Sequence, residues 1–521
     1  MNRDANLSYL SSFNEHWDIV VIGGGATGLG VAVDAASRGL KTLLLEQSDF
    51  AKGTSSRSTK LVHGGVRYLQ QGNLKLVLEA LKERGILLKN APHLTSNQRF
   101  VIPVYSFFRT FYYAFGLKLY DWLSGSLSLG KSEIIDRQAT IRLLPTIRHQ
   151  HLRFGIVYHD GQFDDARLAI SLAQTCSQAG GFPINYMKVT GLAKSKKGRI
   201  DTIYTRDLVN NVDYALKARV VVNATGVFTD SILQMDNPGK KPTIRPSQGT
   251  HIVLDQSFFP GNEAMMLPKT DDGRVLFAVP WHGKVIAGTT DIAINDHSEE
   301  PIASKQEIDF ILSNLGSYLD KKPQVSDILS VFSGLRPLAI PQNNNQKTKE
   351  ISRGHKLLVS QSKLLTITGG KWTTYRKMAE DTVDKAIRIG RLPKAACITR
   401  DLKIHGYSSE TNAFPDHLRA YGSDAEKITM LSQNSEALSR QLHPDYPYTY
   451  AEVVWAVREE MAVCIEDFLA RRIRLLFIDT RAALDIAPEV ARIMAATLGK
   501  NSDWIAKEIS AFSNLAKNYL P

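Results

Sequence analysis

The sequence is poor in cysteine and has no long apolar run. Only three cysteines occur in 521 residues, at Cys176, Cys397 and Cys464, and they are too far apart for a CxxC metal or redox motif. An odd number leaves no closed set of disulfides, which favours a reducing compartment. No stretch of about 18 uninterrupted apolar residues occurs, so we expect no membrane-spanning helix. Residues 1–16 are mostly polar and lack the apolar core of a secretory signal peptide.

Motifs of several functional classes are also missing. No group of His, Asp and Glu has metal-ligand spacing, no G-x-S-x-G nucleophile elbow occurs, and the basic residues form no recognisable nucleic-acid-binding module. The composition is that of a globular protein, with 43% hydrophobic and 22% charged residues. The 64 Lys and Arg residues outnumber the 52 Asp and Glu residues, which gives a net charge of +12. This excess suits an anionic partner, whether a phosphorylated substrate, a nucleotide or an acidic membrane surface.

A β-α-β unit is predicted near the N-terminus. Residues 17–22 form a short apolar run typical of a buried parallel strand, and residues 42–45 form a second one. Between them lies a helical stretch that reaches Arg38 and ends at Gly39.

The turn between the first strand and the helix contains a G-x-G-x-x-G motif, formed by Gly23, Gly25 and Gly28. The first glycine permits the tight turn, the second lets a pyrophosphate approach the backbone, and the third lets helix and strand pack closely. Glu46 ends the second strand, where its carboxylate can accept hydrogen bonds from ribose hydroxyls and would repel a 2′-phosphate. The pattern predicts dinucleotide binding, although on its own it fits NAD as well as FAD.

The rest of the chain divides into a mixed region and a helical one. Before about residue 395 we expect helices at 74–90 and 166–179, a buried strand at 219–224, a hairpin from 274–281 and 284–289, and a polar loop at 341–350. After it, residues 449–452 match a capping box, apolar residues follow at helical spacing to Phe468, and two more helices fit 488–498 and 502–516.

Several uncommon motifs then follow one another in a fixed order. They are residues 54–68 (TSSRSTKLVHGGVRY), 223–226 (NATG), 288–291 (GTTD), 333–338 (SGLRPL), 369–376 (GGKWTTYR) and the helical tail from 459–460 to 471–472. In this order they closely resemble the FAD-dependent glycerol-3-phosphate dehydrogenases, over about residues 17–500.

The resemblance implies an α/β fold with three parts. A glutathione-reductase-like FAD-binding domain would be interleaved with a β-rich substrate domain, as in D-amino-acid-oxidase-type flavoenzymes, within residues 1–395. The FAD-binding parts are expected at about 17–75, 150–245 and 330–390, and the substrate-domain parts at about 76–149 and 246–329. An all-α C-terminal domain would occupy residues 396–521.

The resemblance also implies the site residues. The ADP half of FAD would be held by Gly23, Gly25, Gly28 and Glu46, and the adenine would meet the backbone of Val189. The pyrophosphate and flavin would lie beside Thr54, Ser55, Ser56, Gly226 and Gly370. The substrate pocket would be lined by Arg67, Tyr68, Arg336 and Lys371. No metal is expected.

The chemistry of these side chains agrees with the implied reaction, the oxidation of sn-glycerol 3-phosphate to dihydroxyacetone phosphate. A phosphomonoester carries roughly −1.5 to −2 charges at neutral pH, and arginine grips phosphate oxygens in a bidentate fashion. Arg67 and Arg336 are therefore expected to bind that group. Hydride transfer to the flavin also requires loss of the hydroxyl proton, for which His63 and His251 are candidate bases, and Lys371 lies close enough in the motif to act on the substrate oxygen.

The electron acceptor and the membrane are implied only by the resemblance. The family usually passes electrons to a membrane quinone, which suggests a cytoplasmic enzyme held peripherally on the inner face of the cell membrane, and a homodimer is possible. Ten aromatic residues fall in residues 100–122, among them Phe111, Tyr112 and Trp122, with Arg109 and Lys118 interleaved. This pattern suits a bilayer interface, but it also suits a buried aromatic helix. An oxygen-using oxidase, an amine oxidase of the same fold and a non-catalytic nucleotide- or membrane-binding protein are the alternative functions.

Overall fold

A computed structural model describes residues 1–65, 74–105, 116–123, 125–268, 270–295, 297–340, 354–410 and 414–521. Three predictions fall wholly or partly outside the described residues. They concern the substrate residues Arg67 and Tyr68, the polar loop at 341–350, and positions 106–115 of the aromatic segment, which include Phe111 and Tyr112.

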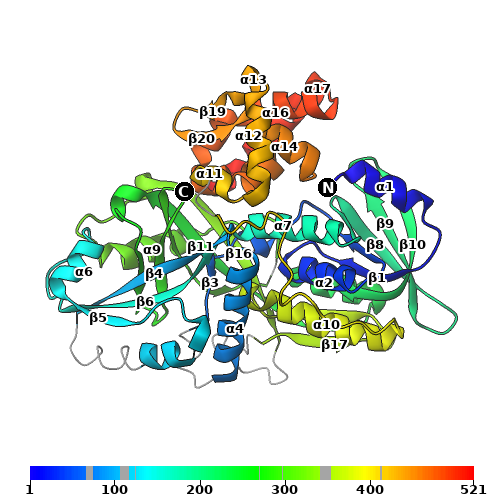
Figure 1. Ribbon diagram of the computed structural model, residues 1–521, viewed down its shortest axis with the longest axis horizontal. Helices are drawn as coiled ribbons and strands as arrows, with labels where there is room; N and C mark the ends of the chain where they lie inside the picture. Colours follow the sequence, from blue (N-terminus) through cyan, green and yellow to red (C-terminus); the bar gives the residue numbers. More distant parts are fainter. Residues whose placement is uncertain are drawn as a thin grey trace.

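An eight-stranded sheet forms the right half of the molecule in Figure 1. Its strands are β1 (Trp17–Ile22), β2 (Thr42–Leu45), β7 (Phe182–Ile184), β8 (Met187–Lys194), β9 (Ile200–Asp207), β10 (Val212–Asn223), β17 (Lys356–Val359) and β18 (Leu365–Thr368). The order is β17-β18-β10-β1-β2-β7, with β8 paired to β9 and β9 to β10. β1 runs parallel to both β10 and β2, so the carboxyl ends of these strands meet at one edge.

Helices cover one face of this sheet, and β8 and β9 together with two helices cover the other, because its strands are apolar on both sides. On one face α2 (Ala26–Ser37) contacts α7 (Asp165–Gln178) and α10 (Tyr375–Gly390), and Ile19 and Val21 of β1 are buried beneath them. On the other face Val20 packs in a cluster with residues of α1 (Arg3–Ser12) and α8 (Thr229–Asp236). Burial on both faces is the usual state of a parallel strand.

A ten-stranded sheet forms the left half of the molecule in Figure 1. Its strands are β3 (Leu61–Val62), β4 (Thr95–Val104), β5 (Glu133–Asp136), β6 (Phe154–Phe163), β11 (Ile244–Asp255), β12 (Ala264–Leu267), β13 (Leu276–Trp281), β14 (Lys284–Gly288), β15 (Ile292–Ala293) and β16 (Ile328–Ala339). The order is β15-β11-β14-β13-β12-β4-β6-β3, with β16 paired to β11 and β5 to β6.

The two faces of the ten-stranded sheet meet different partners. Side chains alternate along a strand, so Val101 of β4 packs in the cluster with Ile311 of α9 (Lys305–Gly316), whereas Phe100 packs with Met266 on the opposite face. This second face is turned toward the eight-stranded sheet. Two helices lie at the edges of this sheet, α4 (Leu74–Asn90) and α6 (Arg137–Leu143).

The C-terminal region is mainly helical and lies above both sheets in Figure 1. Its elements are α11 (Asp416–Arg419), α12 (Ala425–Gln433), α13 (Glu436–Ser439), β19 (Gln441–His443), β20 (Tyr446–Thr449), α14 (Tyr450–Glu459), α15 (Leu475–Ile478), α16 (Thr480–Leu498) and α17 (Ser502–Ala516). β19 and β20 form a short hairpin that is not among the elements predicted from the sequence. The region shares one apolar cluster with Phe332 of β16, so it packs directly on the ten-stranded sheet.

Buried ion pairs attach this region to the eight-stranded sheet. A π-helical turn at Asp467–Arg472 carries Arg471 and Arg472, and both donate hydrogen bonds to Asp49, at 2.5 and 2.7 Å. Asp49 lies three residues after Glu46. Arg474 likewise donates to Asp165 at the start of α7, at 3.0 Å. All three arginines are almost fully buried, where removing a partner leaves an uncompensated charge.

Most of the elements expected from the sequence are present. The strands at 17–22 and 42–45, the helices at 74–90 and 502–516, the capping box of Thr449 and Glu452, and the hairpin turning at residues 282–283 are confirmed.

Two C-terminal helices differ from their predicted bounds. α16 begins at Thr480 rather than residue 488, because Asp479 caps it by accepting from the backbone N–H groups of Arg481 and Ala482, and Pro488 is accommodated inside the helix. The helical spacing expected to continue to Phe468 ends with α14 at Glu459. Met461 has φ of 54°, a left-handed conformation that a continuing helix does not allow.

The sheets cross the expected segment boundaries. β3, β6 and β16 belong to the ten-stranded sheet, and β3, β6 and most of β16 lie in the segments 17–75, 150–245 and 330–390 that the resemblance assigned to cofactor binding. The chain passes between the two sheets several times, and the assignment of these segments to cofactor or substrate binding stays a prediction.

Candidate active site

A cavity of about 760 Å³ lies between the two sheets. Its walls come from the carboxyl ends of β1, β2 and β10, from the segment after β18, and from the inner face of the ten-stranded sheet. Most of the predicted site residues that the structure describes line it, namely Gly23, Gly25, Glu46, Thr54, Ser55, His63, Val189, Gly226, His251, Arg336, Gly370 and Lys371. The volume is within the range of small-molecule and cofactor sites.

The glycine turn has the geometry that its motif predicts. Gly23 has φ of 108°, and a Cβ on Gly28 would lie 1.8 Å from the carbonyl oxygen of Gly23. Gly28 therefore lets α2 pack against the end of β1, and it lies behind the cavity wall rather than in it. Gly25 is the N-cap residue of α2, and a Cβ there would lie 2.9 Å from Ser55 Oγ. The turn leaves no room for side chains at these positions.

Glu46 closes the far side of this turn. Its carboxylate accepts hydrogen bonds from the backbone N–H groups of Gly24, at 2.5 Å, and Ser48, at 2.8 Å. Burial raises the pKa of Glu46 to about 7, against the opposing effect of these two N–H groups. The position at the end of β2 is the one from which an acidic residue reaches a ribose in dinucleotide-binding folds.

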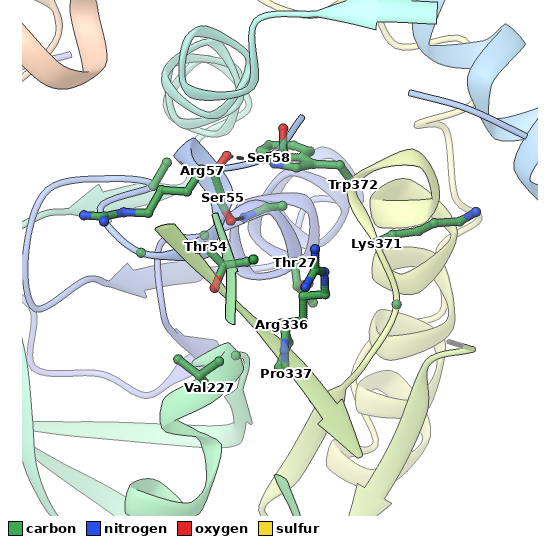
Figure 2. A pocket seen from close by; sticks show the side chains of 18 of the residues that line it. Thr27, Thr54, Ser55, Arg57, Ser58, Val227, Arg336, Pro337, Lys371 and Trp372 are labelled. Atoms are coloured by element: carbon green, nitrogen blue, oxygen red, sulfur yellow. Dashed lines mark hydrogen bonds between the residues drawn. The ribbon is translucent and has the colours of Figure 1, made fainter. Parts of the chain in front are cut away.

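Thr54 and Ser55 cross the middle of the cavity (Figure 2). Ser55 Oγ accepts from the backbone N–H of Ala26, the first residue of α2, at 2.9 Å, and Trp372 Nε1 donates to the carbonyl oxygen of Ser55 at 2.9 Å. Thr54 Oγ1 donates to the carbonyl oxygen of Leu335 at 2.6 Å. Ser56 is different, because it is fully buried and does not line the cavity.

Three backbone positions complete the cofactor side. Val189 lies on β8, paired with Thr205, and is buried against the cavity. Gly226 and Gly370 have φ of 59° and 76°, which side chains rarely allow. A Cβ on Gly370 would also lie 2.3 Å from Met378 Sδ.

Arg336 projects from β16 into the cavity (Figure 2). Its guanidinium donates to Thr289 Oγ1 and to the carbonyl oxygen of Thr290, both at 3.1 Å, and lies 3.4 Å from Asp291 Oδ1. The side chain is 25% exposed, so the cation stays accessible from the cavity.

The two candidate histidines both line the cavity, in different surroundings. His251 on β11 is 2% exposed, its ring stacks on Phe332 at 4.9 Å, and its Nε2 lies 2.9 Å from Thr59 Oγ1. Burial lowers the pKa of His251 well below its usual value, and the nearby cations Lys60 and Arg336 lower it further. His63 follows β3, and its carbonyl oxygen accepts from Thr373 Oγ1 at 3.4 Å.

The remaining predicted cation takes a separate direction. Lys371 is the N-cap residue of the short helical turn Trp372–Thr374, and its side chain extends away from Thr27 and Arg336 in Figure 2. Arg57, which belongs to one of the family motifs, extends to the opposite side and pairs with Glu300 at 2.6 Å.

Other lining residues were not singled out from the sequence. The inner face of the ten-stranded sheet contributes an apolar wall of Phe100, Tyr158, Met266 and Phe277, and Arg274 adds a cation at its end. Period-two alternation on β4 and β6 could have indicated the wall, but no motif marks Arg274, because it lies in an ordinary turn.

The described residues contain neither a metal-binding cluster nor a membrane-spanning helix. Among the residues that the structure describes, no group of three or more His, Cys, Asp and Glu side chains is arranged to hold a metal ion. Within the same ranges no helix is long and apolar enough to cross a membrane.

The chain is similar to known flavoenzymes over most of its length. A family model described as FAD dependent oxidoreductase matches residues 18–376, and one described as the C-terminal domain of alpha-glycerophosphate oxidase matches residues 360–504. A probable mitochondrial glycerol-3-phosphate dehydrogenase of Caenorhabditis elegans is 40% identical, with 98% of this chain and 74% of that protein covered. A mitochondrial glycerol-3-phosphate dehydrogenase of Arabidopsis thaliana is 41% identical, with 92% and 82% covered.

A solved structure gives the same result. The glycerol-3-phosphate dehydrogenase from Bacillus halodurans, complexed with FAD, superposes with a TM-score of 0.80 at 28% identity, covering 100% of this chain and 98% of that one.

The cavity suits the cofactor of those proteins. The N-terminal end of α2 opens onto it, and Gly25 leaves that positive end uncovered by any side chain of its own, as a pyrophosphate requires. Glu46 lines the cavity at the end of β2, where an acidic residue reaches the ribose in dinucleotide-binding folds, and the cavity continues past Ser55 and Gly370 to the inner face of the second sheet. An extended dinucleotide therefore has a wall of matching chemistry along this path.

Proposed function

The chain belongs to the family of FAD-dependent glycerol-3-phosphate dehydrogenases, and we propose on that basis that it oxidises sn-glycerol 3-phosphate to dihydroxyacetone phosphate. The enzyme is an FAD-dependent oxidoreductase. The observation that carries the proposed substrate is Arg336, a partly exposed arginine that lines the same cavity as the glycine turn. It offers a cation to a phosphate group close to the place where the flavin end of the cofactor is expected.

Different residues on the cofactor side hold different parts of FAD. Gly23, Gly25 and Gly28 let the backbone and the N-terminal end of α2 face the pyrophosphate, and Glu46 accepts from the ribose. Val189 faces the adenine, while Thr54, Ser55, Gly226 and Gly370 line the path toward the flavin. Bound FAD supplies the hydride acceptor.

The substrate-side residues bind the phosphate and take the proton. Arg336 binds the phosphate by charge-assisted hydrogen bonds, together with Arg67 from outside the described residues. His251 accepts the hydroxyl proton, because the lowered pKa keeps its imidazole neutral at pH 7 and Thr59 holds the ring in place. His63 is the alternative base, and Tyr68 and Lys371 are proposed to complete the pocket.

Anaerobic mixing of the yellow FAD-loaded enzyme with glycerol 3-phosphate tests this function. We expect bleaching of the flavin absorbance by glycerol 3-phosphate and little by glycerol at the same concentration. Arg336→Met is expected to need much more substrate while retaining its FAD. An enzyme bleached by amines and not by glycerol 3-phosphate would instead be an amine oxidase of this fold, and an FAD-loaded protein bleached by neither would contradict the proposal.

A membrane quinone is the proposed electron acceptor. The match to an oxidase C-terminal domain makes oxygen the second candidate. Reoxidation of the bleached enzyme by a soluble quinone, compared with oxygen, separates the two. One peroxide formed per turnover in air, without acceleration by quinone, would identify an oxidase.

The proposed membrane contact is supported by an exposed apolar surface. Residues 116–123 pack on α4 through Tyr120 and Val77, and on the outside Leu78 is 46% and Trp122 is 77% exposed. Leu78→Glu with Trp122→Glu is expected to release the enzyme from anionic vesicles in co-sedimentation. Met430→Glu is the control, because Met430 is 50% exposed on α12 at the opposite end of the molecule in Figure 1. Equal sedimentation of all three proteins would place the contact elsewhere.

A further inference from the structure

A further arginine, Arg274, lines the cavity at the start of the β13–β14 hairpin. Arg274 ends a tight turn that begins at Thr270, where the backbone N–H of Thr270 donates to the carbonyl oxygen of Arg274 at 2.9 Å. The turn is tied to α9 by a hydrogen bond from the backbone N–H of Asp271 to Asn314 Oδ1, at 3.0 Å. The Arg274 side chain is 15% exposed, so its position is well defined by its surroundings.

One edge of the Arg274 guanidinium is occupied and the other is not. Nε and Nη2 both contact Asp272 Oδ2, and the ring of Phe310 lies 5.5 Å from Cζ. Nη1 is buried and has no hydrogen-bond partner within the part of the chain that the structure describes. A buried N–H group of a cation without a partner is costly, so its presence beside a cavity points to an anion or a strong acceptor that enters from there.

Arg274 and Arg336 belong to segments that leave the ten-stranded sheet at the same end. In the antiparallel β13–β14 pair, Phe277 lies opposite Gly288. Arg274 precedes β13 by two residues, and Thr289 directly follows β14. Because Thr289 and Thr290 hold the guanidinium of Arg336, both cations lie at this end and line one cavity.

We propose that Arg274 is a phosphate-binding residue that makes the enzyme specific for phosphorylated over unphosphorylated substrates. This inference rests on the proposed function. Asp272 holds one edge of the guanidinium so that Nη1 donates to a phosphate oxygen, and Arg336 binds the same group from β16. Two fixed cations, one from a turn and one from a strand, match a doubly charged phosphate better than one does.

The turn does not depend on the Arg274 side chain, because hydrogen bonds among other groups close it. Asp272 Oδ1 accepts from Thr270 Oγ1 at 2.7 Å and from the backbone N–H of Arg274 at 3.1 Å, and the backbone N–H of Gly273 donates to the carbonyl oxygen of Thr270 at 2.9 Å. These hydrogen bonds close the turn without the guanidinium. Replacement of the side chain should therefore leave the fold intact.

The test compares Arg274→Met with wild type, both loaded with FAD. In anaerobic stopped-flow titrations, the glycerol 3-phosphate concentration that gives half-maximal flavin reduction should rise about ten- to hundredfold, as expected for the loss of a hydrogen bond to a charged group. The limiting rate, the FAD content and the rate with glycerol should change by less than about threefold. Arg274→Lys keeps the charge but loses the planar guanidinium. Its half-maximal glycerol 3-phosphate concentration should therefore lie between those of wild type and Arg274→Met.

Arg99→Met is the matched control. Arg99 lies on β4 of the same sheet and pairs with a carboxylate, that of Glu263, through the same two guanidinium atoms, Nε and Nη2, but it does not line the cavity. The Arg99→Met protein should bind glycerol 3-phosphate as wild type does.

Binding of inorganic phosphate, followed by calorimetry on the FAD-loaded proteins, separates this inference from the proposed function. Weaker phosphate binding by Arg274→Met than by Arg99→Met supports the anion site even if glycerol 3-phosphate fails to bleach the wild type, a result that would reject only the proposed function. Unchanged binding of both glycerol 3-phosphate and phosphate in Arg274→Met and Arg274→Lys, or equal losses with glycerol and glycerol 3-phosphate, would overturn the assignment of Arg274.

Discussion

The two ends of the cavity are built in different ways. The nucleotide end is formed by backbone, with Gly23, Gly25 and the N-terminal end of α2, and one continuous stretch of about thirty residues supplies most of it. The substrate end is formed by side chains that are far apart in the sequence, with His251 on β11, Arg274 in the turn before β13 and Arg336 on β16. The first end depends on where side chains are absent, and the second on which side chains are present.

This difference determines how each end fails when it is changed. Gly23 and Gly28 tolerate no substitution, because the nearest atoms that a Cβ would meet there are backbone, the carbonyl oxygens of Ala224 and Gly23. A side chain on the inner face of the ten-stranded sheet can be shortened while the sheet remains, because strand pairing does not depend on it. Substitutions at the nucleotide end should therefore destabilise the fold and abolish FAD binding together. Substitutions at the substrate end should lower only substrate binding and catalysis.

Gly28→Ala is the strongest test of the first half of this comparison. The new Cβ would lie 1.8 Å from the carbonyl oxygen of Gly23, so α2 must move off β1. We expect a loss of at least about 3 kcal/mol of folding stability and no FAD in the purified protein. Thermal denaturation and the flavin absorbance measure both effects.

Gly191→Ala is the control for that experiment. Gly191 lies on β8 of the same sheet, and a Cβ there would meet Tyr204 Cδ2 at an ordinary 3.5 Å. It should keep wild-type stability and FAD content. A Gly28→Ala protein that bound FAD normally would show that the turn can open without loss of the site.

His251→Asn tests the substrate end. Loss of a general base should lower the limiting rate of flavin reduction by about 10²- to 10⁴-fold, while FAD content and melting temperature stay near those of wild type. His63→Asn, measured in parallel, should have a smaller effect. The reverse order would assign the proton transfer to His63.

The pH dependence of the wild type provides a second readout for His251. A base acts only when unprotonated, and burial together with Lys60 and Arg336 lowers the pKa of His251 well below its usual value of about 6.5. The rate should therefore persist below pH 6.5 and fall only at more acidic pH. A midpoint at or above pH 6.5 that disappears in His251→Asn would contradict this assignment of the pKa.

The same contrast explains how much the sequence alone predicts. The glycine turn, β1, α2, β2 and Glu46 follow from local spacing, because the residues that define them are close together in the sequence, even though β1 also pairs with β10 and α2 packs on α7 and α10. Arg336 entered only through a resemblance to a family, since no local pattern distinguishes it from a surface arginine. Arg274 was not identified from the sequence, because its significance depends on a guanidinium edge without a partner in the described residues and on a cavity lined by many strands of both sheets.

The helix bounds show the same limit at the C-terminus. The spacing of apolar residues from Val453 to Phe468 predicts one helix, yet α14 ends at Glu459 and a π-helical turn follows. The reason is tertiary, because Glu460 pairs with Arg167 of α7 and Arg471 pairs with Asp49 after β2. Buried ion pairs between distant segments leave no periodic signal, so local pattern could not reveal them.

The smallest expected effect concerns Glu46, an acidic side chain at the nucleotide end. Burial raises the pKa of Glu46 to about 7, and only the ionised carboxylate accepts hydrogen bonds fully from a ribose. Since protonation removes that acceptor, the affinity for FAD should fall by up to about tenfold per pH unit as the pH drops below 7, and should level off above pH 8. Glu46→Gln, which cannot ionise, should bind FAD more weakly at pH 8 and lose this dependence, as fluorescence titration of the apoprotein would measure. A wild-type affinity that stayed constant from pH 6 to 8 would mean that Glu46 contributes to the turn through Gly24 and Ser48 alone, and that the nucleotide end is built entirely of backbone.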